Sequence, residues 1–112
     1  MAWLNRVFLA GRLTRDYQCR YTAGGKAVGR FGLAIDRKYH RPDGEEVEEV
    51  CFVEVQLVGD AAEHSRDFLD KGVLVLVEGW LVNAEWKDRR GVKHSRLQVL
   101  AKDVQFLAAP VH

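Results

Sequence analysis

One stretch of the sequence decides the fold: Val50–Val58, which reads VCFVEVQLV. Its odd-numbered positions from 51 to 57 are all apolar, whereas the even-numbered positions from 52 to 56 are Phe52, Glu54 and Gln56. Alternation with a period of two residues is typical of a β-strand with one face against a core. We therefore expect the odd-numbered side chains to face inward, which leaves Phe52 on the polar side.

Similar alternation occurs on both sides of this stretch. Four further strands are predicted, with Gln18–Tyr21 as a short continuation of the first: Asn5–Leu13, Ala27–Asp36, Val73–Ala84 and Ser95–Leu107. Turns between them are predicted at Gly24-Gly25, at Pro42-Asp43-Gly44, and at Gly91 in the polar loop Lys87–Lys93. The chain therefore reads mainly as β-structure.

A single short helix is expected after the central strand. Asp60 is a candidate N-cap with Glu63 three residues later, and Gly72 after Lys71 is a candidate C-terminal stop. The order is then three strands, a helix and two strands. This is the order of the OB-fold, an all-β, five-stranded Greek-key barrel, with the helix between strands 3 and 4. A chain of 112 residues fits one such domain, residues 1–112.

Composition favours a folded cytoplasmic protein. Apolar residues make up 47% of the chain and charged residues 29%, which is unlike a disordered sequence. The longest apolar run, Val73–Val77, is too short to cross a bilayer, and no leader-like segment opens the chain. We expect no membrane association and a location in the cytoplasm, on the nucleoid.

Neither metal binding nor catalysis is indicated. Cys19 and Cys51 belong to no CxxC motif, and we expect both to be buried thiols rather than a disulfide or metal ligands. The histidines are scattered: His40, His64, His94 and His112. The acidic residues lie mostly in expected turns and on the helix surface, so they do not form the carboxylate cluster of a metal-dependent nuclease. We expect no metal, no cofactor, no catalytic residue and no enzyme activity.

The charges are unevenly distributed, although the formal net charge is only +1. Residues 1–41 hold nine lysines and arginines against two acids, and residues 86–112 hold six against two, whereas residues 42–85 are strongly acidic. A basic groove forms if the two ends come together in the fold. A mixed, solvated surface explains the charge pattern equally well.

Three aromatic residues stand outside the expected core. Phe52 is on the polar side of its strand, Trp86 precedes a basic loop, and Tyr39 follows Arg37-Lys38. Taken singly, each has another explanation: core for Phe52, an interface for Trp86 and loop packing for Tyr39. Together they favour single-stranded nucleic acid, whose bases stack on aromatic rings while lysine and arginine hold the backbone. Lys87 and Arg96 are predicted basic contacts near Trp86.

The remaining aromatic residues are assigned other roles. We expect packing from Trp3, Phe8, Tyr17, Tyr21 and Phe106, and a subunit contact from Trp80. The segment Gly29-Arg30-Phe31-Gly32 faintly resembles an RNA-recognition motif, but that fold needs two helices. Glycine in a curved barrel strand explains the segment better.

Several motifs in order along the chain resemble one family. They are LNRVFLAGRL at Leu4–Leu13, DFLDKG at Asp67–Gly72, VEG at Val77–Gly79 and VQFL at Val104–Leu107. Together they resemble the bacterial single-stranded DNA-binding proteins over nearly the whole chain.

The resemblance implies an OB-fold homo-oligomer, a tetramer, that binds single-stranded DNA without sequence preference. It further implies protection of that DNA in replication, recombination and repair, with replication and repair proteins as partners. The family's stacking aromatics fall on Tyr39, Phe52 and Trp86, and two of its basic positions fall on Lys71 and Arg20.

This sequence departs from the family pattern in two respects. A fourth stacking position is occupied by Val58, and Glu54 and Glu85 stand where basic residues are common. The family's acidic C-terminal tail is also not found up to His112, so either the protein lacks this tail or the sequence is part of a longer chain. The missing tail favours an alternative, a tailless primosomal OB-fold adaptor of the replisome, whereas the retained aromatic set argues against it.

Overall fold

The computed structural model describes residues 2–111, so Met1 and His112 lie outside the described part. Its strands and helices are β1 (Val7–Leu13), β2 (Gln18–Tyr21), β3 (Ala27–His40), β4 (Glu46–Val58), α1 (Asp60–His64), the 3-10 helix η1 (Ser65–Asp67), β5 (Leu74–Lys87) and β6 (Lys93–Ala108).

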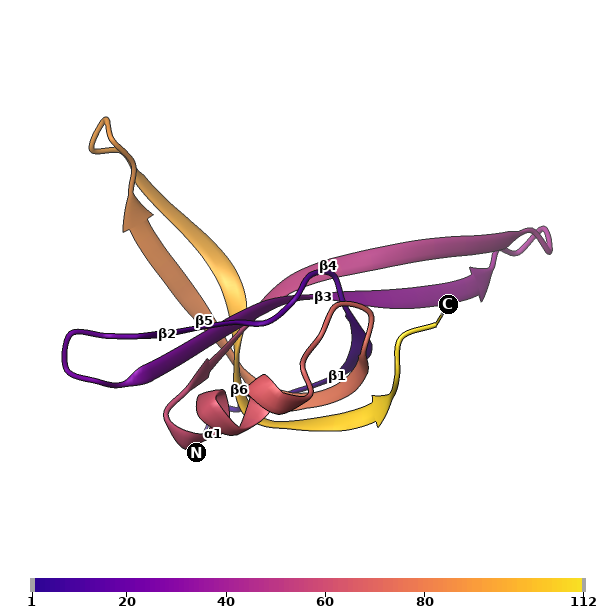
Figure 1. Cartoon of the computed structure of the whole chain (residues 1–112). Helices are drawn as coiled ribbons and strands as arrows, with labels where there is room; N and C mark the ends of the chain where they lie inside the picture. Colours follow the sequence, from indigo (N-terminus) through magenta and orange to yellow (C-terminus); the bar gives the residue numbers. More distant parts are fainter. Residues whose placement is uncertain (1, 112) are drawn as a thin grey trace.

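The strands form one closed sheet (Figure 1). The six strands are ordered β1-β5-β6-β4-β3-β2, and an additional pairing of β1 with β3 closes the barrel. β4 and β6 run parallel where they meet, and the other pairs are antiparallel. With β2 as the short continuation of β1, this is the predicted five-stranded OB-fold barrel, and its helix follows the third of the predicted strands.

The alternation in β4 is confirmed. Val55 and Leu57 are fully buried, whereas Phe52 is 71% exposed. Together with β4, the inward faces of the other strands fill the barrel with large apolar side chains, of which the most deeply buried are Phe31, Leu33, Leu57, Val55, Val75, Val77 and Val99. Leu69, which follows η1, is buried with them. Burying one such side chain contributes roughly 1.5–3 kcal/mol, so this inner set fixes which face of each strand points outward.

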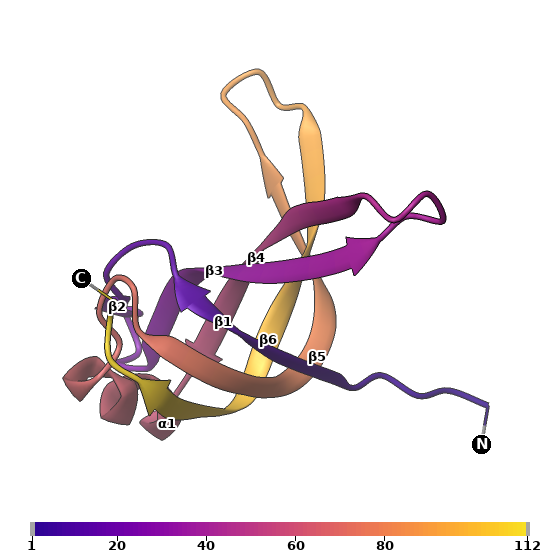
Figure 2. The same cartoon turned by 90° about the vertical axis from the view of Figure 1, so that its right-hand side faces the viewer.

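Two hairpins extend from the barrel as long arms (Figures 1 and 2). The β3–β4 arm continues to His40 and starts again at Glu46, and the β5–β6 arm reaches Lys87 and Lys93, so the strands run further than predicted. No core lies beneath the arms to impose alternation on their sequence. Cross-strand pairing maintains them instead, with ion pairs such as Lys38–Glu48.

The helix is shorter than predicted, and the predicted capping box is wrong. Gly59 is the N-cap, with φ of 70° and no side-chain cap, and Asp60 is the first helical residue. The Gly59 N–H donates to the Ala27 carbonyl at 2.9 Å, so this glycine turns the chain sharply from β4 into α1. Gly72 does take a left-handed φ of 87°, but in the turn that leads to β5.

Tyr17 packs into the core as predicted. Its ring meets Phe31 edge-on at 6.2 Å, and its hydroxyl donates to the Ala62 carbonyl at 2.8 Å. Burial raises the pKa of this hydroxyl above its usual value. A side chain at Gly29 would overlap the Tyr17 ring, which gives this strand glycine a packing reason.

Most other packing predictions are wrong. The aromatic side chains of Trp3, Phe8 and Tyr21 are exposed, whereas Phe106, although half exposed, packs its ring edge-on against Phe68 at 6.4 Å. Cys51 is exposed as well, and Cys19 is only half-buried. Cys51 lies on the same face of β4 as the buried residues Val55 and Leu57. It is exposed because β4 leaves the barrel at this point and no core covers it.

Residues 2–111 offer neither a membrane-spanning helix nor a cluster of metal ligands. None of their helices has the length and apolar character needed to span a membrane. These residues also contain no group of three histidine, cysteine, aspartate or glutamate side chains placed to hold a metal ion. The fourth histidine in the sequence, His112, lies outside them.

Candidate nucleic-acid interface

The outward face of β2, β3 and β4 is set by their pairing. Phe52 lies opposite Ala34, Glu54 opposite Gly32, Gln56 opposite Arg30, and Val58 opposite Val28. On the other side of β3, Gln18 pairs with Arg30, and Arg20 pairs with Val28. Since directly paired residues share a face, Phe52, Arg30 and Arg20 all project from the same outer surface.

Phe52 lies beside a small hollow of about 180 Å³ that connects this surface to β6. Arg96 of β6 lines the hollow together with Phe52, Arg15 and Glu54. The hollow therefore places one exposed aromatic ring and two guanidinium groups around the same space, although they come from distant parts of the chain.

Glu54 is neutralised by Arg15. The Arg15 Nη2 donates to the Glu54 Oε1 at 2.5 Å, and the Glu54 side chain is only 18% exposed. Gly32 makes this contact possible, because a side chain there would overlap the Arg15 guanidinium and the Thr14 hydroxyl. An acid on the outer face is thus compensated by a basic residue from the β1–β2 connection.

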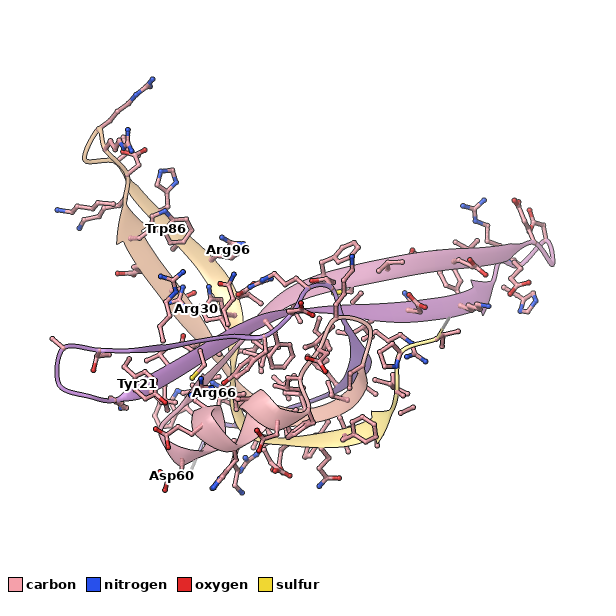
Figure 3. The ribbon with its side chains drawn as sticks, in the orientation of Figure 1. Tyr21, Arg30, Asp60, Arg66, Trp86 and Arg96 are labelled. Atoms are coloured by element: carbon pink, nitrogen blue, oxygen red, sulfur yellow. The ribbon has the colours of Figure 1, made fainter. Side chains whose placement is uncertain are left out.

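Trp86 forms a second exposed aromatic site near the end of the β5–β6 arm. Its side chain is 43% exposed, and its ring stacks on that of His94 with centroids 5.5 Å apart and planes 19° apart. The Arg96 guanidinium lies 5.5 Å from the Trp86 ring centroid, within cation–π range. Arg96 thus borders both the Phe52 hollow and the Trp86 ring, as Figure 3 shows for Trp86 and Arg96.

The loop at the end of this arm is held by Asp88. Its carboxylate accepts backbone N–H groups from Arg90 and Val92 at 2.8 and 3.0 Å, and it contacts the His94 Nε2 at 2.9 Å. The hydrogen bond with His94, followed by those from the backbone, lowers the pKa of the Asp88 carboxyl below its usual value. His94 is thereby fixed beside Trp86. Lys87 and Lys93 face each other next to this ring and line a hollow of about 380 Å³.

Tyr39 occupies a different place from Phe52. It pairs with Val47 in an unbroken ladder, so alternation puts it on the opposite face of the β3–β4 ribbon from Phe52. Its hydroxyl donates to the Glu49 carboxylate at 3.0 Å, which raises the pKa of that hydroxyl, and the Arg37 guanidinium lies 4.5 Å from its ring centroid. The structure brings Phe52, Arg96 and Trp86 together and leaves Tyr39 on the arm.

The predicted basic residues lie at separate points. Arg20 is exposed on β2, on the outer face with Arg30. Lys71 is exposed in the turn before β5, where its backbone N–H donates to Asp16 at 2.8 Å. Three candidate residues were missed from the sequence: Arg15, Arg30 and His94. Arg30 could have been found from its strand parity, since it shares the even-numbered face of β3.

A closed barrel of this order, with exposed aromatic and basic side chains on its outer strands, is an OB-fold of the oligonucleotide-binding kind. The family model described as the single-strand binding protein family matches residues 4–107. The chain therefore belongs to the single-strand binding protein family.

Named relatives and solved structures agree with this assignment. The chain is 43% identical over 103 residues to a single-stranded DNA-binding protein of Wolinella succinogenes, covering 92% of this chain and 64% of the relative. It is 42% identical to that of Helicobacter hepaticus, covering 92% of this chain and 61% of the relative.

Among solved structures, the wild-type single-stranded DNA binding protein from Thermus aquaticus matches with a TM-score of 0.81 and 39% identity, covering 94% of this chain and 50% of that one. A deletion mutant of the same protein matches with a TM-score of 0.83 and 38% identity, covering 94% and 51%. The chain thus spans less than two thirds of these relatives' length.

Proposed function

We propose that this protein binds single-stranded DNA without sequence preference. The observation that carries the proposal is the placement of Arg96 beside both Phe52 and Trp86, whose rings are exposed. Stacking is indifferent to base identity because every base has a π-face, and arginine beside a ring holds the adjacent phosphate. The names of the relatives support the same function.

Bases stack on Phe52 and Trp86 in this proposal, and Tyr39 adds a further ring from the β3–β4 arm. Phosphates are held by the basic residues Arg96, Lys87, Arg20 and Lys71. The biological role that follows is the protection of single strands in replication, recombination and repair on the nucleoid. The match to proteins named for single-stranded DNA favours this role over that of a primosomal adaptor.

A titration with oligo(dT) and with duplex of the same length tests the proposal. We expect the single strand to quench tryptophan fluorescence and to bind much more tightly than the duplex. Affinity for the single strand should fall with rising salt, by about 0.7 log units per log unit of salt for each neutralised phosphate. Equal affinity for the duplex, or strong preference for one short sequence, would overturn it.

A homotetramer is the proposed assembly. Phe8 of β1 pairs with Glu78, and Ala10 pairs with Leu76, so these residues share the outer face of β1 and β5. Phe8 is exposed there, and the Trp80 ring lies 5.4 Å from the Arg6 guanidinium. An exposed apolar face of this kind marks a contact surface. Light scattering at micromolar concentration should give four times the chain mass, and a monomer would contradict the assignment.

A further inference from the structure

We propose that the DNA track continues past the barrel face to the β2 edge, where Tyr21 stacks a base and Arg66 holds its phosphate. This inference rests on the proposed single-strand binding. It concerns residues that neither the family resemblance nor the aromatic pattern assigned to DNA.

Tyr21 and Arg66 already form a pair. Tyr21 ends β2 with 51% of its surface exposed, and its hydroxyl accepts a hydrogen bond from the Arg66 Nη1 at 3.1 Å. Arg66 lies in η1, which the chain places against this edge, and Figure 3 shows the two labelled side chains close together beside the helix. A guanidinium has five N–H donors in a plane, so this contact leaves donors for a phosphate.

Charge favours an anionic ligand at this edge. Several basic residues elsewhere are neutralised by carboxylates, as in Arg15–Glu54 and Arg37–Glu49. Within residues 2–111, no carboxylate lies within ion-pair distance of Arg20, Arg30 or Arg66. These three guanidinium groups therefore remain available.

Two surface hollows join these residues. A hollow of about 440 Å³ is lined by Arg20, Tyr21 and Arg30, and a second of about 570 Å³ is lined by Arg20 and Arg66 together with Asp16 and Asp70. Because Arg20 borders both, the hollows form one surface that bends around β2. β2 is the last strand in the sheet order, so its outer edge has no further strand against it among the described residues.

This surface reaches the Phe52 site around the β2 edge. Tyr21 pairs with the buried Ala27, so alternation turns it to the other face of β2 from Arg20, and the first hollow, which both residues line, joins the two faces. Along β3, the outer face runs from Ala34 opposite Phe52, through Arg30, to Val28 opposite Arg20. Six residues of extended strand span about 20 Å, which is room for several nucleotides. In Figure 3 the labelled residues follow the same order, from Trp86 and Arg96 through Arg30 to Tyr21 and Arg66.

The ligand is single-stranded DNA rather than an acidic peptide, because an exposed ring stands among the arginines. A base stacks on such a ring and its phosphate meets a guanidinium, whereas a peptide carboxylate uses only the charge. The same surface also continues from a site already proposed for bases.

Oligonucleotides of two lengths distinguish a failure of this inference from a failure of the proposed function. Binding of oligo(dT) of about 4 and about 16 nucleotides, the range of OB-fold site sizes, is measured for the full chain and three variants. Tyr21→Leu removes the ring, Arg66→Gln removes the charge, and Lys102→Gln is the matched control. Lys102 is an exposed lysine 3.9 Å from Glu78 on another part of the barrel. Quenching of Trp86 confirms that the short strand occupies the Phe52–Trp86 region.

We expect Tyr21→Leu to weaken binding of the long strand roughly 5- to 150-fold, the loss of one stacked base. Arg66→Gln should lower the log–log salt slope for the long strand by about 0.7. Both variants should bind the short strand as the unaltered protein does, and Lys102→Gln should change neither strand. If Tyr21→Leu is too unstable to measure, Arg66→Gln alone tests the inference. Arg66 is exposed, so its substitution should leave the fold stable.

Three outcomes would overturn the inference. Normal binding of the long strand by both variants leaves the Phe52–Trp86 site in place but removes the β2 edge from the track. Equal losses on both strands mean that the variants act through the barrel rather than at the edge. Failure of the unaltered protein to bind either strand overturns the proposed function and this inference together. Binding of an acidic peptide that depends on Arg66, with normal DNA binding, would assign the edge to protein.

Discussion

The Arg15 guanidinium donates to the Glu54 carboxylate at 2.5 Å, across the space left by Gly32 on the outer face of the barrel. Each of the three residues has its function only with the others. Glycine gives the arginine room, and the arginine neutralises an acid that would otherwise repel phosphate beside Phe52. The ion pair also neutralises the charge of Arg15, which weakens the attraction of this residue for a phosphate.

Glu54→Gln should therefore strengthen single-strand binding. The change frees Arg15 for a phosphate and removes a negative charge, so the log–log salt slope should increase by about 0.7. Stability should change by about 1 kcal/mol or less, since the Arg15 side chain is 41% exposed and solvent screens the pair. Titration of oligo(dT) at several salt concentrations measures the slope. Glu63→Gln in α1 removes the same charge elsewhere, and weaker binding by Glu54→Gln would contradict the argument.

Trp86→Ala should remove most of the fluorescence quenching caused by single-stranded DNA. The exposed Trp86 ring stacks on a base in our proposal, and losing it should cost about 1–3 kcal/mol of binding free energy. Trp80→Phe is the matched control, because Trp80 lies six residues nearer the barrel on β5, with its ring 5.4 Å from the Arg6 guanidinium. Quenching that survives in Trp86→Ala and disappears in Trp80→Phe would place the bases elsewhere.

Phe52→Ala should weaken binding by a similar amount while leaving the fold nearly as stable. The side chain is 71% exposed, so its removal opens no cavity. Phe31→Ala is the contrast, because Phe31 is fully buried and truncating a buried phenylalanine costs about 3–5 kcal/mol of unfolding free energy. Denaturant unfolding and DNA titration of both proteins provide the comparison. A large loss of stability in Phe52→Ala, with normal binding by the folded protein, would contradict the assignment of Phe52 as an exposed base-stacking residue.

The loop at the end of the β5–β6 arm should respond to acid. The pKa of Asp88 is lowered chiefly by His94, so the ionised carboxylate stabilises the loop above the usual aspartate value of 3.8. This contribution is present above pH 3.8 and is lost as the pH falls through the lower folded pKa. In NMR titrations, the Arg90 and Val92 amide shifts should report a midpoint below 3.8.

His94→Ala should move that midpoint up toward 3.8, because it removes the hydrogen bond that lowers the pKa of Asp88 most. His40→Ala, at the end of the other arm, serves as the control and should leave the Asp88 midpoint in place. An unchanged midpoint in His94→Ala would show that the backbone N–H groups alone hold the carboxylate.

Much of the fold could be predicted from the sequence. Alternation placed Val55 and Leu57 in the core and Phe52 outside it, and Gly44 and Gly91 marked the ends of the two arms with φ of 88° and 81°. These properties depend on residues close together in the chain. The motifs that resemble the family lie within residues 4–107, the range that the family model matches.

The sequence by itself thus determined the barrel, its inward and outward faces, and the exposed aromatic rings at Phe52 and Trp86. Only the tertiary structure decided which groups meet: Arg15 with Glu54, Tyr21 with Arg66, and Arg96 with both aromatic sites. It also placed Tyr39 across the ribbon from Phe52. Periodicity depends on neighbours along one strand, whereas these contacts join residues 39 and 45 positions apart, so their geometry depends on strand register and barrel closure.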